Sequence, residues 1–300
     1  MDNNFSRRDF LQLSGLSLAA TALSTDPLTM ADNFYSPKHL GLQLWSVRED
    51  MNKDAAGTLK AVAKMGYKEV EPFGYDPATG KIFGLLMAEF NKLVKANGLK
   101  IRSSHSGFKL ADYNSSTKVL SDRAKKIIDV SATSGQKYII NAYIDETERK
   151  NTAEVVKLME AAAMYARKAG LKFGYHNHDF EFKTKGADGR MLYEWLLQEI
   201  DPKLMTMEMD LYWVVFAGQN PVEWFQKYPG RFELCHAKDM SKADKHPSIE
   251  FGDGTIDFKT IFANRSKAGL KYFIIELENY LTTPMKGAER SFQNFKALKV

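Results

Sequence analysis

One unit recurs along the chain: a helical stretch, a glycine, a lysine two residues later, and then a short β-prone run. The glycines of these units are Gly66, Gly98, Gly135, Gly170 and Gly269. The first four are 32, 37 and 35 residues apart, and the last interval of 99 residues has room for three units of 33. Glycine adopts the left-handed conformation that ends a helix at the least cost. Each unit therefore predicts a helix, its C-cap and a strand.

The repeat and the runs between its copies predict eight strands. They are Leu40–Val47, Lys68–Phe73, Lys100–His105, Tyr138–Tyr143, Lys172–His178, Met205–Leu211, Phe232–Lys238 and Tyr272–Asn279. Helical periodicity fills the intervals, as in Thr152–Lys168. Strands that alternate with helices pair in parallel, so eight of them predict an α/β fold, the (β/α)8 TIM barrel. An open doubly wound sheet is the alternative, and the absence of a glycine-rich loop after the first strand disfavours it.

The beginning of the chain has the pattern of an export signal. Arg7 and Arg8 precede an apolar run, Leu11–Leu23, that is too short to cross a bilayer. The paired arginines resemble a twin-arginine signal peptide. We therefore predict a signal peptide over residues 1–24, a linker over residues 25–37 and one barrel domain over residues 38–300. The expected protein is periplasmic, with no stable membrane insertion after signal removal. An amphipathic first helix is the alternative.

Composition limits the kinds of partner and cofactor. The net charge of +5 is spread along the chain without basic clusters that alternate with aromatic residues, which argues against a nucleic-acid partner. The single cysteine, Cys235, excludes an intramolecular disulfide and a thiolate metal cluster.

Polar residues gather at the predicted strand ends, where a barrel of this kind builds its active site. They include Trp45, Glu71, His105, Asn141, the run from His176 to Glu181, Glu208, Asp210, His236, Lys238, Glu276 and Glu278. Carboxylates and imidazoles without a thiolate suit one divalent cation, Mn, Mg, Co or Zn. Asp210, His236 and Glu276 belong to three successive strands, so we expect them side by side. A fourth ligand is expected from the fifth strand, and spacing does not choose among the candidates there: His176, His178 and Glu181.

Four segments together resemble the sugar phosphate isomerase/epimerase group of the xylose isomerase-like barrels. They are residues 175–182, 208–213, 236–240 and 252–258, and the resemblance extends from about Leu40 to Val300. It implies one divalent metal held by residues of strands 5 to 8. The implied ligands are Glu181, Asp210, His236 and Glu276, with His178 as the alternative from the fifth strand.

The resemblance also implies proton abstraction next to a carbonyl through a metal-stabilised enediolate. The catalytic candidates are Glu181, Glu276, Lys238 and His105, the two glutamates as the pair that removes and returns the proton. The candidates for binding the sugar are Trp45, Glu71, Asn141, His176 and Trp213.

Three functions are compatible with these residues. The first is a metal-dependent carbohydrate isomerase or epimerase. The second is a lyase or hydratase that acts on keto-sugars or 3-keto-glycosides by the same proton abstraction; export favours it, because sugar phosphates are cytoplasmic metabolites. The third is a non-catalytic sugar-binding barrel, which predicts that a metal ligand is missing. The expected partner is a small carbohydrate, and a homodimer is possible from the sequence.

Overall fold

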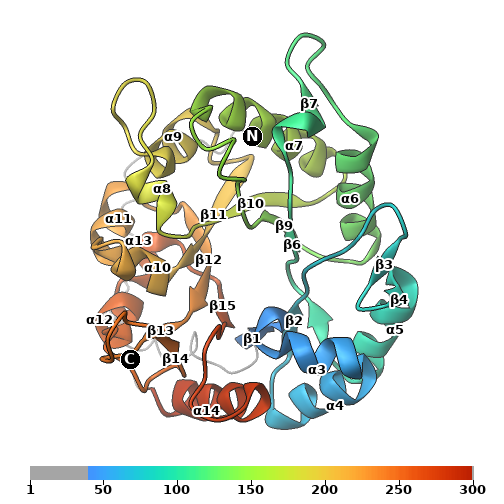
Figure 1. Cartoon of the computed structure of the whole chain (residues 1–300), viewed down its shortest axis with the longest axis vertical. Helices are drawn as coiled ribbons and strands as arrows, with labels where there is room; N and C mark the ends of the chain where they lie inside the picture. The colour runs from blue at the N-terminus through green and yellow to red at the C-terminus, as the bar shows by residue number, and fades with distance from the viewer. Residues whose placement is uncertain (1–39, 299–300) are drawn as a thin grey trace, which may run out of the picture. The chain divides into compact units, whose positions relative to one another are not determined.

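The computed structural model describes residues 40–298, which form a closed barrel of parallel strands inside a ring of helices (Figure 1). The barrel strands are β1 (Leu40–Gln43), β2 (Glu69–Glu71), β5 (Lys100–Ile101), β6 (His105–Ser106), β9 (Tyr138–Asn141), β10 (Lys172–His176), β11 (Met205–Asp210), β12 (Phe232–Ala237) and β15 (Tyr272–Ile275). They are hydrogen-bonded in the order β5-β2-β1-β15-β12-β11-β10-β9-β6. The two ends of this order, β5 and β6, are halves of the third predicted strand, and they close the ring by pairing with β2 and β9. The predicted (β/α)8 barrel is confirmed.

Helices follow the strands and cover the outside of the barrel. They are α3 (Arg48–Lys53), α4 (Ala55–Met65), α5 (Met87–Ala96), α6 (Asp122–Thr133), α7 (Thr152–Lys168), α8 (Phe180–Lys183), α9 (Leu192–Glu199), α10 (Leu211–Phe216), α11 (Pro221–Lys227), α12 (Phe258–Ala263), α13 (Arg265–Ala268) and α14 (Pro284–Ala297), with the 3-10 turns η2 (Leu44–Val47) and η3 (Leu110–Asp112). Gly66 and Gly269 end α4 and α13 in the left-handed conformation, as the repeat predicts.

Three short hairpins lie in the loops between these elements. They are β3 (Lys81–Ile82) with β4 (Leu85–Leu86), β7 (Tyr113–Asn114) with β8 (Val119–Leu120), and β13 (Asp239–Met240) with β14 (Ser248–Ile249). The predicted signal peptide (residues 1–24) and linker (residues 25–37) lie outside the described residues. Within residues 40–298, no helix has the length and apolarity that crossing a membrane requires.

All the predicted strands except the third end earlier than the sequence predicts, and after two of them local hydrogen bonds turn the chain at the mouth of the barrel. The first strand stops at Gln43, whose side chain accepts a hydrogen bond from the amide of Trp45 and so starts η2. The sixth strand stops at Asp210, whose carboxylate accepts from the amide of Trp213 and caps α10. The side chains at the mouth of the barrel therefore belong to the turns that follow the strands as well as to the strands themselves.

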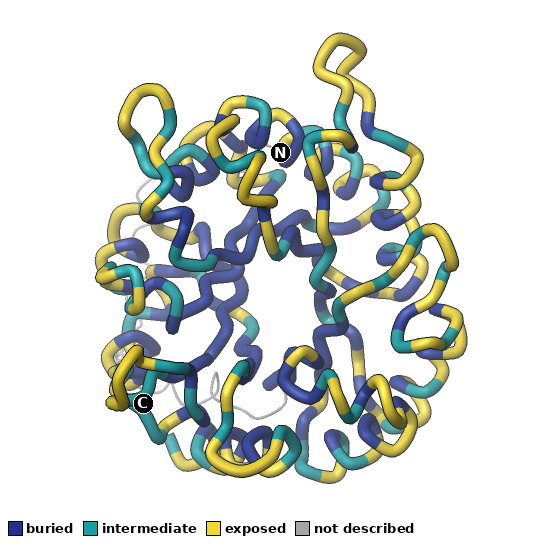
Figure 2. Tube along the Cα trace, viewed as in Figure 1, coloured by how far each residue is buried: buried dark blue, intermediate teal, exposed yellow. Residues whose placement is uncertain are grey.

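The barrel interior is buried along the strands (Figure 2), and its side chains differ in polarity from one end of the barrel to the other. Tyr138, Ile140, Leu234 and Ile274 form an apolar cluster inside it. Towards the amino ends of the strands the interior carries paired charges. Glu69 is bonded to Arg102, and Glu233 accepts hydrogen bonds from Tyr138 at 2.5 Å and Lys172 at 2.9 Å. These pairs satisfy the polar groups that the barrel buries.

Glu233 is expected to support the stability of the barrel in a pH-dependent way. Burial raises its pKa, but hydrogen bonds from Tyr138, Lys172 and Lys271 outweigh burial and lower the pKa to about 2. A carboxyl whose pKa is lower in the folded state stabilises the fold above its ordinary pKa, and loses this contribution as the pH falls towards the folded value. We expect Glu233→Gln to lower the free energy of unfolding by about 2–3 kcal/mol at neutral pH.

Urea unfolding at pH 7 and at decreasing pH checks this expectation. The difference between the wild type and Glu233→Gln should shrink below about pH 4.5. Glu199→Gln is the control, because Glu199 is exposed and its ion pair with Arg190 is worth at most about 1 kcal/mol. Equal effects of the two substitutions would contradict the assigned role of Glu233.

Candidate metal centre

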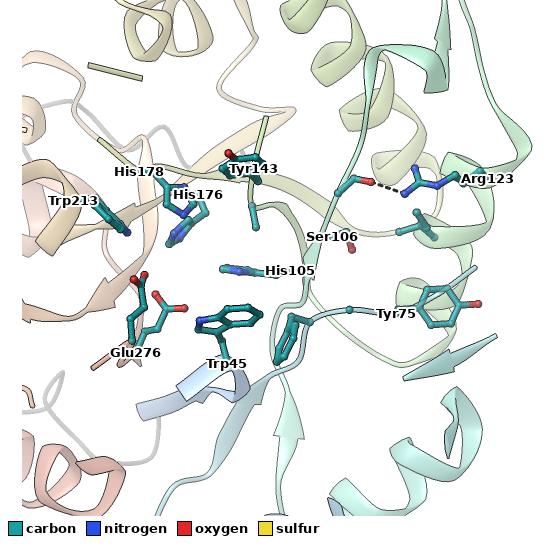
Figure 3. Close-up of a pocket in the computed structure, with 16 residues that line it drawn as sticks. Trp45, Tyr75, His105, Ser106, Arg123, Tyr143, His176, His178, Trp213 and Glu276 are labelled. Carbon is teal, nitrogen blue, oxygen red and sulfur yellow. Dashed lines mark hydrogen bonds between the residues drawn. The ribbon is translucent and has the colours of Figure 1, made fainter. Parts of the chain in front are cut away.

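A cavity of about 500 Å³ lies at the carboxyl ends of the strands (Figure 3). Its wall is formed by the following residues: Trp45, Phe73, Gly74, Tyr75, His105, Ser106, Gly107, Arg123, Ile127, Ala142, Tyr143, His176, His178, Trp213, Glu276 and Glu278. The titratable groups His105, His176, His178 and Glu276 are near Trp45 and Trp213, while Tyr75 and Arg123 lie farther to the side. A volume of this size is typical of small-molecule sites.

Four buried residues beside the cavity form a group that can hold a metal ion. His176, Asp210, His236 and Glu276 each offer one ligand atom, and these atoms lie within 4.8 Å of one another. The Nδ1 of His236 is 3.1 Å from Oε2 of Glu276 and 4.0 Å from Oδ2 of Asp210. The Nε2 of His176 is 3.9 Å from the same Asp210 oxygen. We call these residues the four-residue group.

Strand register brings the four-residue group together. Asp210 is paired with His236 across β11 and β12, and His236 is paired with Ile274 of β15, two residues before Glu276. Residues two apart on a strand face the same side, so Glu276 continues the inward face of Ile274 beyond the strand end. His176, the last residue of β10, completes the group from the neighbouring strand.

A second group overlaps the first. It consists of His105, His176, Glu208 and His236. The shared histidines face Glu208 with the ring nitrogens that the first group does not use, Nδ1 of His176 and Nε2 of His236. Oε2 of Glu208 is 2.7 Å from Nε2 of His105, 3.4 Å from Nδ1 of His176 and 3.3 Å from Nε2 of His236. The imidazoles of His105 and His236 stack with their ring centroids 5.1 Å apart.

Lys238 is a fully buried ammonium that directly follows β12 and contacts two members of the four-residue group. Its Nζ donates to Oδ2 of Asp210 at 3.3 Å, to Oε2 of Glu276 at 3.0 Å and to Oε1 of Glu278. Burial lowers the pKa of Lys238, but these three carboxylates outweigh burial and raise the pKa above its ordinary value. The residue is therefore a permanent positive charge that partly neutralises the acidic side of the site.

The electrostatics of the site favour a bound cation. Burial raises the pKa of Asp210 to about 6 and that of Glu208 to about 7, because the charged carboxylates lack water. Burial and the imidazoles of His236 and His105 hold the pKa of His176 well below its ordinary value, which keeps this ring neutral, as a metal ligand must be. Oε1 of Glu208 and Nδ1 of His176 are buried without a hydrogen-bond partner. The residues present therefore fit a divalent cation bound by nitrogen and oxygen atoms.

Most of the predicted site residues do meet at this cavity. Asp210, His236 and Glu276 lie together, and His176 is the fifth-strand residue that joins them. His105, His178, Trp45 and Trp213 line the cavity wall.

Glu181 does not join them, so the structure does not place it among the metal ligands or opposite Glu276 as a proton carrier. Its carboxylate accepts hydrogen bonds from the hydroxyl of Tyr175 at 2.7 Å and the amide of His178 at 2.9 Å. β10 ends at His176, and the turn into α8 carries Glu181 towards Tyr175, which points away from the barrel interior. Burial raises the pKa of this glutamate to about 8.

Two predicted sugar-binding residues have other contacts. Asn141 follows the inward-facing Ile140 and so faces outward, where it accepts from the amide of Phe108 and donates to the carbonyl of Tyr143. Glu71 is 1% exposed and is bonded to Gln43 and His236. Neither is among the residues of the cavity wall.

Glu208 and Glu278 are site residues that the sequence prediction left without a role. Glu208 precedes Asp210 by two positions, so strand alternation alone puts both carboxylates on the same inward face. Glu278 stands in the same relation to Glu276 and lines the cavity.

The fold and the site define a class of protein: a (β/α)8 barrel with a buried histidine and carboxylate group at the carboxyl ends of its strands. Within this class the chain belongs to the xylose isomerase-like TIM barrel family, whose sequence profile matches residues 59–298.

Solved structures and curated proteins are similar to this chain. A sugar phosphate isomerase/epimerase from Parabacteroides distasonis ATCC 8503 is 30% identical, with a TM-score of 0.75 over 86% of this chain and 93% of that one. The IolI protein with a bound zinc atom shares the fold, with 14% identity and a TM-score of 0.65 over 86% of this chain and 96% of that one. Inosose dehydratase 2 from Bacillus cereus is 28% identical over 130 residues, which are 38% of this chain and 42% of that protein. The chain thus spans less than half the length of this curated relative.

Proposed function

We propose that this protein is a divalent-metal-dependent carbohydrate isomerase or epimerase that removes a proton from the carbon next to a carbonyl. The observation that carries the proposal is the four-residue group, buried beside a cavity of small-molecule size. Its members His176, Asp210, His236 and Glu276 would hold the ion, either Mn, Mg, Co or Zn. When bound, the ion would act as a Lewis acid on the carbonyl and hydroxyl oxygens of the sugar. The zinc atom named for the IolI protein supports a divalent metal.

Two side chains at the cavity wall are suited to moving the proton. The Glu276 carboxylate accepts a hydrogen bond from Lys238 at 3.0 Å, and we assign it removal of the proton. The His105 imidazole is bonded to Glu208 at 2.7 Å, and we assign it return of the proton.

The remaining groups bind and orient the sugar or adjust charge. The rings of Trp45 and Trp213 line the cavity and would cover an apolar face of the sugar. Lys238 is buried behind Glu276, so it sets the charge of that carboxylate without touching the sugar.

A lyase or hydratase that acts on keto-sugars or 3-keto-glycosides is the second candidate. It uses the same site and the same proton abstraction but then expels a group from the neighbouring carbon. The similarity to inosose dehydratases, although partial in length, favours it. A non-catalytic sugar-binding barrel is the third candidate. It predicts a missing ligand, whereas His176, Asp210, His236 and Glu276 are all present.

We also propose a periplasmic location on the strength of the twin-arginine-like sequence around Arg7 and Arg8. This location favours unphosphorylated sugars and glycosides as substrates. Mass spectrometry of the mature amino terminus tests it: an unprocessed terminus on protein recovered from the native cell envelope would contradict export.

Solvent exchange in D₂O tests the proposed reaction. Protein loaded with Mn²⁺ or Zn²⁺ is incubated with keto-sugars, inososes and 3-keto-glycosides. The negative control is the same protein stripped with EDTA, and reloading the stripped protein should restore the activity. We expect deuterium next to the carbonyl with the loaded protein only. A rearranged or epimerised product of otherwise unchanged mass identifies an isomerase, and a product that has lost water or an aglycone identifies the lyase. Absence of exchange and of product from the loaded protein would leave the sugar-binding barrel.

A further inference from the structure

Glu71 is a buried carboxylate that the proposed reaction does not use. It is the last residue of β2, and its Oε2 accepts a hydrogen bond from Nε2 of Gln43 at 2.8 Å. Gln43 is itself held by the amide of Trp45, which donates to its Oε1 at 3.1 Å. The same Oε2 of Glu71 lies 2.7 Å from Nε2 of His236. The backbone at the mouth of β1 thus fixes Gln43, Gln43 fixes Glu71, and Glu71 is directed at a predicted metal ligand.

The two ring nitrogens of His236 face two different sets of carboxylates. Nδ1 faces Glu276 and Asp210, at 3.1 and 4.0 Å, and Nε2 faces Glu71 and Glu208, at 2.7 and 3.3 Å. A neutral imidazole has one N–H and one lone pair, so it ligates a cation through a single nitrogen. The nitrogen that keeps the proton therefore decides on which side of the ring a cation is held.

We propose that Glu71 is a positioning residue that keeps the His236 proton on Nε2 and thereby commits Nδ1 to the metal ion. A carboxylate that accepts the second N–H of a metal-bound histidine fixes both the tautomer and the orientation of the ring. Of the two acids near Nε2, Glu71 makes the shorter contact and has the hydrogen bond. The inference rests on the metal-dependent function proposed above, because it concerns the same ion.

The proposal also decides between the two overlapping groups. The second group would need Nε2 of His236 and Nδ1 of His176, which are the opposite nitrogens to those of the four-residue group. With Nε2 of His236 donating to Glu71, only the four-residue group is left to bind a cation. Glu208 lies 3.4 Å from Nδ1 of His176, but no hydrogen bond joins them, so the choice between the two groups depends on His236. The chain therefore holds one divalent ion and not two.

Isothermal titration calorimetry with Zn²⁺ on the metal-stripped full chain tests the proposal. We expect one ion per wild-type chain, and a dissociation constant that is about 10–100-fold higher in Glu71→Gln. Glu71→Asp retains the charge and should recover part of the affinity. Glu69→Gln is the matched control, because Glu69 is a buried glutamate of the same strand that is bonded to Arg102 and not to a histidine.

A second measurement reports the tautomer directly. In ¹⁵N NMR spectra of the zinc-loaded wild type, the His236 resonances should show Nε2 protonated and Nδ1 bound to metal. Protonated Nδ1 would overturn the proposal, as would two ions per chain, or equal affinities of the wild type and Glu71→Gln. A wild type that binds no divalent ion would instead overturn the proposed function and the inference together, so the two failures are distinguishable.

Discussion

Asp210→Asn is expected to weaken binding of the divalent metal by more than about 100-fold, beyond the usual loss from mutating an outer-sphere partner. Oδ1 of Asp210 caps α10 by accepting from the amide of Trp213 at 3.1 Å, and asparagine can keep this bond. Oδ2 is the atom that faces His176 and His236, and an amide in its place removes the negative charge that a cation needs. Metal analysis after dialysis and the D₂O exchange assay should show both properties lost together.

Asp179→Asn is the control for this substitution. Asp179 follows the fifth strand and directly precedes α8, and its carboxylate is paired with Lys183 at the end of that helix. We expect this variant to retain the metal and the exchange activity. Full metal occupancy and exchange in Asp210→Asn would show that the ion is held elsewhere.

Lys238→Met is expected to lower the free energy of unfolding of the metal-free protein by about 3–5 kcal/mol, as removal of one member of a buried ion pair does. Lys238 is fully buried among the carboxylates of Asp210, Glu276 and Glu278. Methionine fills similar space but leaves these charges without a cation. A bound divalent ion neutralises the same carboxylates, so added metal should stabilise the variant, by about 4 kcal/mol at a thousand times the dissociation constant.

Urea unfolding with and without excess Mn²⁺ measures this effect. Lys242→Met provides the matched control, because Lys242 is exposed in the loop that follows β13. We expect the control to unfold like the wild type under both conditions. A metal-free Lys238→Met protein as stable as the wild type would show that the carboxylates are already protonated or relieved by water.

The repeat predicts the barrel because each of its parts has a local cause. Glycine C-caps such as Gly66 end the helices, and periodicity sets the bounds of α7, which the structure reproduces. Asp210, His236 and Glu276 were predictable as neighbours because they occur at the ends of successive strands, and in a parallel barrel these ends meet at one rim.

The fifth strand is the part of the site for which the sequence did not identify the residue that joins the metal group. His176, His178 and Glu181 are close in the chain, and the choice among them depends on where β10 ends. That end is accompanied by the turn into α8 and by the hydrogen bond between Tyr175 and Glu181, whose geometry residue spacing alone does not give. Asn141 and Glu208 differ from this case, because counting positions along β9 and β11 would have placed the first outward and the second inward.

The paired charges at the amino end of the barrel also constrain how this sequence can change over time. Loss of Arg102 alone would leave the carboxylate of Glu69 buried without its cationic partner. Loss of Lys172 would remove one of the hydrogen bonds that Glu233 accepts. Replacement of both members of such a pair by apolar residues of similar size can be nearly neutral. Substitutions in this layer are therefore epistatic. Change at the amino end of the barrel should therefore proceed by paired replacements, in which both members of a charged pair are exchanged together.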